Sequence, residues 1–428
     1  MSVHWGGRGA GHISRWSAST TGVPALVLDF LTTTSLDSRV TFTRASTATF
    51  VGSNGLIQTA AINAPRFDYD PVTLAAKGLL IEEQRTNLVT YSEQLDNVVW
   101  VKTAASVSAN VTTAPDGLTT ADNLIPSTAN GVHSVRAVSA SVTAGATVTA
   151  SIYAKAAGYG NFVYRVGNAS GTAAFQVAVN ITSGTIGVPS AFGTGATVAS
   201  ATITASGNGW YRITLTGAIT GLLAYANDVF VANSSGATSF AGNGTSGIYL
   251  WGGQMEAASF ATSYIPTVAS TVIRSADVAT MTGTNFSSWY NQTEGTFVAS
   301  FQNVVDTVGG GKVVFSANDG TNNNRIAMIT TSALVEGRIV VGGVATNPAQ
   351  RAITPNAVAK SAIGAAAGNA AQFTNGVLNS QVTPSSIPTV NRLEIGANLA
   401  STFLNGHIRQ ISYYNTRLLN SQLQTLTQ

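Results

Sequence analysis

The sequence contains no cysteine and little charge. Without cysteine the chain can form neither disulfides nor thiolate metal sites, so its fold is independent of the redox state of its surroundings. Charged residues make up 9% of the sequence, against about 25% in ordinary soluble domains. The net charge of +3 is not gathered into any cluster of Lys and Arg, so we expect no nucleic-acid partner.

Long apolar runs are also missing. The best candidate, Val23 to Leu31, is interrupted by Pro24 and Asp29. It falls well short of the roughly 20 residues that a membrane-spanning helix needs. The sequence therefore predicts no insertion into a membrane.

In place of charge the chain has Thr, Ser, Ala, Asn and 43 Gly. Thr and Val suit the half-buried surface of a sheet, and Gly and Asn adopt the positive φ angles of tight hairpin turns. Helix formers such as Glu and Lys are scarce. We therefore predict an all-β fold, and a length of 428 residues favours two or three domains.

The order of turns and strand-like runs divides the chain into five segments. We expect an extended N-terminal arm (1–22), a β-rich adaptor module (23–95), a jelly-roll sandwich (96–266), a linker (267–283) and a second sandwich (284–428). Trp5, Arg8, Arg15 and Trp16 are the anchoring candidates in the arm, since little else there could dock on a partner. The polar tail near residues 418–424 predicts one short helix.

Three composite motifs resemble modules of bacteriophage tail-fibre and capsid-fibre proteins. The first combines residues 42–49, 65–69 and 78–88, the last of which reads GLLIEEQRTNL. The second runs from Trp100 to the WGGQME and SYIPT segments (251–256 and 263–267) and is similar to carbohydrate-binding jelly rolls. The third, at 373–376, 393–396 and 404–414, resembles a concanavalin or laminin-G sandwich, a fold that hosts many functions.

The resemblance implies a structural component of a phage virion, exposed on the particle surface as a fibre or spike subunit. By analogy with such fibres we expect a homotrimer that contacts other virion proteins through the arm and displays its sandwiches to a host cell-surface polysaccharide. Two alternatives stay open. One is a purely architectural decoration or fibre-base protein without a ligand, and the other, less favoured, is a glycan depolymerase.

Glycan binding by a sandwich usually needs aromatic rings for the apolar side of a sugar. The candidates are Trp210, Tyr211, Tyr153, Tyr164 and Trp251. Strand alternation sends Trp210 and Tyr211 to opposite faces of one strand, so only one of the two is expected in the core. Large rings also dominate protein cores and subunit contacts. Packing in the core or at a subunit contact is therefore favoured for each of the five residues.

Hydrolysis of a glycan would need two facing carboxyl groups, one of them protonated. The acidic residues near Asp68 and Glu82 share their segment with Arg44 and Arg66, so ion pairing is favoured over catalysis. The four His residues are too scattered to suggest a metal site or a general base. We expect no catalytic residue, no metal and no cofactor.

The resemblance also implies a possible calcium site. Carbohydrate-binding jelly rolls and concanavalin or laminin-G sandwiches often bind calcium in their loops. Asp228 or Asp319 could supply oxygen ligands. No loop of the sequence is dense in such ligands, so calcium is not favoured.

Overall fold

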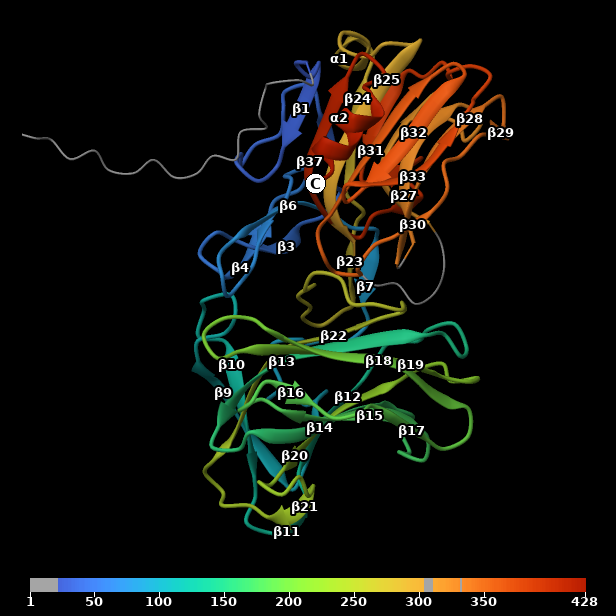
Figure 1. Cartoon of the computed structure of the whole chain (residues 1–428). Helices are drawn as coiled ribbons and strands as arrows, with labels where there is room; N and C mark the ends of the chain where they lie inside the picture. The colour runs from blue at the N-terminus through green and yellow to red at the C-terminus, as the bar shows by residue number, and fades with distance from the viewer. Residues whose placement is uncertain (1–21, 304–310, 332) are drawn as a thin grey trace, which may run out of the picture.

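The computed structural model describes residues 22–303, 311–331 and 333–428, and it contains two stacked β-sandwiches (Figure 1). Two short helices are the only ones in these ranges, so the predicted all-β class is confirmed. The arm residues Trp5, Arg8, Arg15 and Trp16 lie outside the described residues. No helix in the described part of the chain is long and apolar enough to cross a membrane.

The middle of the chain forms one sandwich, the lower body in Figure 1, which we call the inserted sandwich. Its first sheet has the order β18 (Ala196–Ala205), β19 (Tyr211–Ile219), β13 (Val148–Ala157), β22 (Gly247–Glu256), β10 (Ala121–Pro126), β9 (Ala105–Thr112). The second has the order β16 (Thr185–Ile186), β15 (Ala174–Asn180), β14 (Asn161–Gly167), β20 (Ala226–Ala232), β12 (Ser134–Val138), β8 (Val101–Thr103), with β17 (Ser190–Phe192) beside β15. A small ribbon joins β11 (Asn130–Val132) and β21 (Ser239–Ala241).

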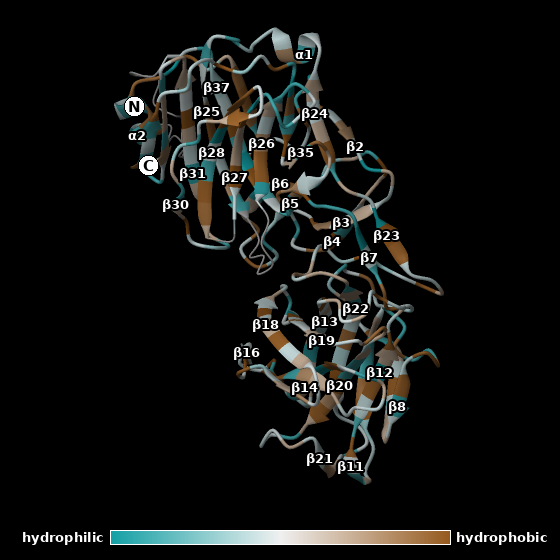
Figure 2. Ribbon diagram, turned by 90° about the vertical axis from the view of Figure 1, so that its right-hand side faces the viewer, coloured by the Kyte–Doolittle hydropathy of each residue, from teal (hydrophilic) through white to brown (hydrophobic). Residues whose placement is uncertain are grey.

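Period-two patterning explains why these segments pair as they do. In β14 the buried residues Phe162, Tyr164 and Val166 alternate with partly exposed ones. Alternate side chains of a strand lie on opposite faces, so the apolar set of each sheet meets the other sheet in one core. The changes of hydropathy along the strands can be followed in Figure 2.

Both ends of the chain build the other sandwich, which we call the terminal sandwich. One sheet has the order β33 (Val377–Val382), β32 (Asn369–Thr374), β31 (Ala359–Ala366), β25 (Glu294–Asn303), β37 (Gly406–Tyr414), β6 (Ala76–Ile81), β5 (Phe67–Tyr69), with β1 (Leu26–Asp29) also on β37. The other has the order β2 (Thr41–Thr43), β24 (Val278–Thr282), β34 (Arg392–Ile395), β26 (Lys312–Asn318), β27 (Arg325–Thr330), β28 (Leu334–Val341), β29 (Val344–Ala345), with β30 (Arg351–Ala352) beside β28.

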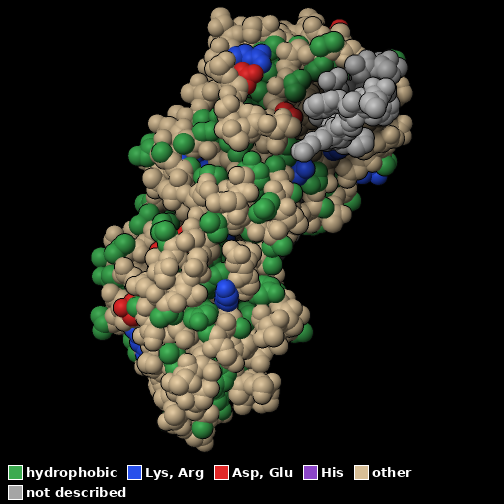
Figure 3. All heavy atoms as spheres, turned by 90° about the vertical axis from the view of Figure 1, so that its left-hand side faces the viewer, with side chains coloured by type: hydrophobic (Ala, Val, Ile, Leu, Met, Phe, Trp, Pro, Cys, Tyr) green, Lys and Arg blue, Asp and Glu red, His purple; other side chains and the backbone are tan. Residues whose placement is uncertain are grey.

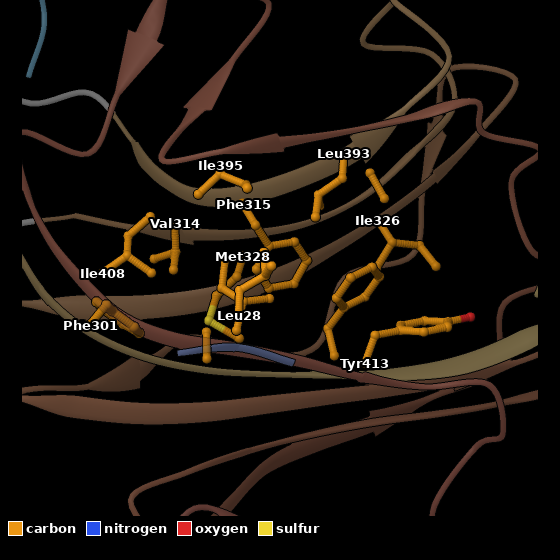
Figure 4. Packing of buried hydrophobic residues seen from close by; sticks show 14 of the residues in the cluster. Leu28, Phe301, Val314, Phe315, Ile326, Met328, Leu393, Ile395, Ile408 and Tyr413 are labelled. Atoms are coloured by element: carbon orange, nitrogen blue, oxygen red, sulfur yellow. The ribbon is translucent and has the colours of Figure 1, made fainter. Parts of the chain in front are cut away.

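Residues 23–95 therefore share sheets with the C-terminal half, where the sequence suggested a separate adaptor. Strand β1 pairs with β37 in the register Leu26 to Tyr413, and β6 pairs with the same strand further along, Ile81 opposite Gly406. The physical reason is a common core. Leu28 packs with Phe301, Phe315 and other residues nearly 300 positions away (Figure 4). Local patterning carries no information about such distant pairing.

The expected linker 267–283 also contains strands. Strand β23 (Val272–Arg274) pairs with β7 (Arg85–Asn87), and β24 then enters a sheet of the terminal sandwich. The chain thus leaves the terminal sandwich along β7 and returns along β23. This places the inserted sandwich within the terminal one in the order of the chain.

Four small elements complete the terminal sandwich. The hairpin β3 (Ala48–Val51) and β4 (Ile57–Ala60) lies near the junction of the two bodies, and β35 (Ala397–Asn398) pairs with β36 (Thr402–Phe403). Helix α1 (Thr284–Ser287) is one turn long, and α2 (Asn420–Leu426) confirms the helix predicted in the tail.

Candidate functional site

A cleft of about 460 Å³ lies between the two sandwiches. Its floor is the β13–β19–β18 part of the inserted sandwich, the sheet that faces the terminal sandwich in Figure 1. Its opposite wall comes from β3, β5 and β6 and from the turn before β37, and the segment 259–264 closes one side. We call these parts the floor, the wall and the side.

Hydroxyl groups cover the floor. Ser200, Thr202 and Thr204 alternate along β18, and Thr214 and Thr216 continue the pattern on β19. The residues between them, such as Ile203 and Leu215, pack toward the core of the sandwich. Period-two alternation therefore gives this sheet one apolar and one hydroxyl-lined face.

Cross-strand hydrogen bonds hold the hydroxyl groups in place. Thr202 Oγ1 lies 2.6 Å from Thr214 Oγ1, and Thr149 Oγ1 lies 2.8 Å from Thr216 Oγ1. A hydroxyl group can donate one hydrogen bond and accept two. The Thr202–Thr214 pair is accessible and therefore keeps hydrogen-bonding capacity for a ligand, whereas Thr149 and Thr216 are buried and Thr149 also donates to Ala258 O.

Arg212 and Tyr153 form the end of the floor nearest β22. They are opposite each other in the β13–β19 register, with the guanidinium carbon 5.5 Å from the centre of the tyrosine ring. Arg212 Nη2 donates a hydrogen bond to Ser151 Oγ over 3.0 Å, and its Nε is buried without a partner among the described residues. The floor thus presents one cation beside one aromatic ring.

The wall carries a compact charged group. Asp68 Oδ2 lies 2.7 Å from His407 Nε2 and 3.6 Å from Lys77 Nζ, and Asp68 Oδ1 accepts the backbone N–H of Val51. Burial alone would raise the pKa of the Asp68 carboxyl, but His407, Lys77 and the Val51 N–H together hold that pKa below its ordinary value. Asp68 is therefore a carboxylate at neutral pH.

Asn405 lies beside this group on the wall. It is 2% exposed, and its Oδ1 accepts the backbone N–H of Glu83. Its Nδ2 has no hydrogen-bond partner in the part of the chain that the structure describes. A buried amide nitrogen without a partner is uncommon in native proteins, so this donor is a candidate contact for a bound group.

A buried ion cluster stands behind the wall. Asp277 pairs with Arg44, at 3.1 Å, and with Arg66, and Glu82 pairs with Arg66 at 2.8 Å and with Arg274 at 3.5 Å. Burial alone would raise the pKa of the Glu82 carboxyl, but Arg274 and Arg66 hold it well below its ordinary value. Ion pairing was the predicted role of Arg44, Arg66 and Glu82, and it is confirmed.

Sequence reasoning missed the other two members of the cluster. Arg274 and Asp277 fall in the stretch 267–283, which looked like a linker. Two opposite charges three residues apart in such a stretch are a weak signal, and only the return of β23 and β24 to the terminal sandwich brings them beside Glu82.

Three of the predicted glycan-binding aromatics meet in one cluster. Tyr153 lies 5.4 Å from Trp251 between ring centres, and Trp251 lies 4.5 Å from Tyr264. Trp210 belongs to the same cluster and donates its indole N–H to Thr113 O. Tyr264 lines the cleft and was not singled out from the sequence.

The structure buries most of these rings. Trp210 and Trp251 are 2% and 1% exposed, and Tyr164 is fully buried in the sandwich core. A ring with no free face cannot stack on a sugar, so these three side chains pack the protein interior. Tyr211 is half-buried against the same core as Tyr164. Of the five predicted aromatics only Tyr153 lines the cleft, and at 4% exposure it offers a ligand an edge and no free face.

The cleft lacks a pair of carboxyl groups suited to glycoside hydrolysis. Asp68 and Glu82 are the acidic residues that line it, and both have lowered pKa values. A general acid must carry a proton at the working pH, which requires a raised pKa. Neither residue meets that requirement.

The two side chains considered as calcium ligands, Asp228 and Asp319, already have partners within the protein. Asp228 forms a salt bridge with Arg136, and Asp319 accepts hydrogen bonds within its own turn from Thr321 and Asn324. Among the described residues no three His, Asp or Glu side chains are placed to hold a metal ion together.

No protein-family model matches the chain, and no curated protein is similar to it in sequence. Solved structures match parts of it. A Ruminococcus gnavus carbohydrate-binding module of an IT-sialidase, bound to α2,3-sialyllactose, is 18% identical over 32% of this chain and 83% of its own, with a TM-score of 0.28. Domain 4 of an extracellular arabinanase from Geobacillus stearothermophilus, in complex with arabinotriose, is 13% identical over 40% of this chain and 82% of its own, with a TM-score of 0.29.

A third match is botulinum neurotoxin type C, 11% identical over 35% of this chain and 39% of the toxin chain, with a TM-score of 0.28. At these scores the alignments carry no argument about function.

Proposed function

We propose that the chain is a non-catalytic glycan-binding protein and that the cleft between its sandwiches is the binding site. The observation that carries this proposal is the hydroxyl-lined floor with its prearranged cross-strand bonds. A sugar presents many hydroxyl groups, each needing donors and acceptors in fixed directions. Binding costs less when the protein side chains are already held in place.

The other surfaces of the cleft add the features that orient a ligand. Tyr153 and Phe260 line the cleft with little of each ring exposed, 4% and 7%, and Asn405 has an amide N–H on the wall without a partner among the described residues. Ligand sites commonly combine apolar surface with a few placed polar groups in a cavity of about 300–1,000 Å³. The cleft falls within that range.

A blocking substitution tests the location of the site. Thr202→Trp places a bulky ring on the exposed floor, and Thr197→Trp places the same ring on the same strand outside the cleft. We expect Thr202→Trp to weaken binding to the strongest ligand of a glycan array by about ten-fold or more and Thr197→Trp to leave it unchanged. Wild-type binding by Thr202→Trp would sink the proposal, provided both variants keep the wild-type melting temperature.

We further propose that the chain is a bacteriophage virion component, a fibre or spike subunit that presents this cleft to a host surface as a homotrimer. The support is the resemblance of its three composite motifs to phage fibre modules. The low charge fits a subunit that buries surface in an assembly, because charged side chains are depleted at interface cores. Few charged side chains are visible on the face drawn in Figure 3.

Cryo-electron microscopy of intact particles tests this second proposal. Three copies around a local axis, with clefts facing outward from a fibre or spike, would support it. Copies confined to the capsid shell or an internal collar would favour the architectural alternative, and absence of the chain from particles would refute the virion assignment.

A further inference from the structure

The charged side chains that line the cleft are Asp68, Lys77, Glu82 and Arg212, with His407 beside them. Three of the four charges are balanced. Lys77 and Asp68 are partners at 3.6 Å, and Glu82 is held by two arginines of the buried ion cluster. Arg212 is the exception, because the described residues place no carboxylate within salt-bridge distance of it.

The setting of Arg212 makes this lack of a partner notable. Its side chain is half-buried, Nη2 is tied to the neutral hydroxyl of Ser151, and Nε is shielded from solvent without an acceptor. Partly removing a guanidinium from water is unfavourable unless a negative charge or good acceptors replace the lost hydration. The ring of Tyr153 offers only the weaker cation–π attraction.

We propose that the ligand of the cleft is an acidic polysaccharide whose anionic substituent binds the guanidinium of Arg212. The inference rests on the proposed glycan-binding function and adds the chemical class of the glycan. A guanidinium presents a planar fork of N–H donors that fits the oxygens of a carboxylate, a sulfate or a phosphate. The hydroxyl rows of β18 and β19 would then bind the neutral part of the same sugar chain.

The charged side chains around Arg212 are compatible with an anionic group bound there. Asp68, a negative group on the wall, is compensated by Lys77 and accepts a hydrogen bond from His407. An anion on Arg212 therefore meets a wall whose negative charge is already paired. The Lys155 side chain extends from the same strand as Tyr153 but does not line the cleft.

An array of matched polysaccharides tests the inference. Each acidic polysaccharide is printed beside its neutralised form, carboxyl-reduced for uronic acids and desulfated or dephosphorylated for esters. Wild-type protein, Arg212→Gln, Arg212→Lys and the control Lys155→Gln are compared, and circular dichroism verifies that each variant is folded. We expect binding to acidic members that falls about ten-fold or more when the anionic group is neutralised.

The variants sharpen the result. Arg212→Gln should bind the acidic polysaccharide more weakly than wild type by the same factor. Arg212→Lys should lose less affinity than Arg212→Gln, because it keeps the charge without the planar fork. Lys155→Gln should bind with wild-type affinity. The neutralised form that loses binding identifies the anionic group. Equal binding to acidic and neutralised forms, or wild-type affinity in Arg212→Gln, would overturn this inference and leave the proposed function standing. Absence of binding to every glycan would overturn both.

Discussion

Glu82 connects the buried ion cluster to the inserted sandwich, together with Arg66, which donates a hydrogen bond to Ser263 Oγ. Its carboxylate accepts the backbone N–H of Ser263 at 2.8 Å and the Ser263 hydroxyl at 2.7 Å, in addition to its arginine partners. Ser263 follows the last strand of the inserted sandwich. One carboxylate therefore connects the charge of the terminal sandwich to the backbone of the other body.

Removing the negative charge of Glu82 should destabilise the fold. We expect Glu82→Gln to lower the free energy of unfolding by about 3–5 kcal/mol, because it leaves Asp277 as the one remaining salt-bridge partner, among the described residues, of the buried Arg66 and Arg274. Asp37→Asn removes a partner from the surface pair Asp37–Arg39 and should cost less than about 1 kcal/mol. Urea unfolding measures both, and similar losses in the two variants would contradict the role assigned to the cluster.

The lowered pKa of Glu82 also predicts a pH dependence. The ordinary pKa of a Glu carboxyl is 4.5, and that of Glu82 lies well below it. The unfolded chain therefore binds this proton more readily than the folded chain. The stabilisation from Glu82 should be complete above about pH 5 and should be lost as the pH falls below 4.5.

Unfolding free energies measured from pH 7 to pH 3 check this prediction. Wild-type protein should lose stability across the acid range, and Glu82→Gln should show a shallower loss because it lacks the titrating group. Identical slopes in the two proteins would show that Glu82 is not responsible.

At the scale of elements, strand β22 shows how one strand positions Tyr153, a ring that lines the cleft. The β13–β22 register shifts between Ser151 and Tyr153, and Gly252 on β22 has a φ of +65°. A Cβ at Gly252 would lie 3.0 Å from the Tyr153 ring and 3.3 Å from that of Tyr264. The irregularity therefore allows both rings to pack against the backbone.

Gly252→Ala should disturb this packing. We expect a loss of roughly 1–2 kcal/mol in the free energy of unfolding, since an L-residue is strained at this φ, together with weaker glycan binding as Tyr153 moves. Gly131→Ala, in β11, has open space for its Cβ and no positive φ, and it should be nearly neutral. Calorimetric melting and array binding measure both effects, and unchanged binding in Gly252→Ala would argue against a role of Tyr153 in the site.

Strands were predictable from sequence because alternation and turn residues are local. The runs near β13, β14 and β19 follow directly from apolar residues at every second position. The same local signal could not show which aromatic lines the cleft. Tyr153 and Trp251 are opposite each other in the β13–β22 register and both are buried, yet Tyr153 lines the cleft and Trp251 does not.

At the scale of the whole molecule, the cleft exists because one sandwich is inserted within the other. The floor comes from the inserted sandwich and the wall from the terminal sandwich, so the cleft needs both bodies. The sequence suggested separate modules in a row, since pairing between β1 and β37 spans almost the entire chain. That long-range closure is the part of the architecture, and hence of the site, that local patterns could not reveal.

Insertion predicts which fragments fold. Residues 88–271 contain a self-contained core and should unfold cooperatively when expressed alone. Residues 284–428 lack β1, β2, β5, β6 and β24, which supply Leu28, Phe67 and Ile81 to their core, and should not. Thermal melts followed by circular dichroism decide the matter, and a cooperative melt of 284–428 would contradict the shared core.

A crystal structure of the protein with the strongest glycan of the array tests the central claim most directly. The account predicts sugar density in the cleft, with hydroxyl groups in hydrogen-bond contact with Thr202 and Thr214 and an anionic group on Arg212. Sugar density on an outer face of either sandwich, with the cleft empty, would contradict it.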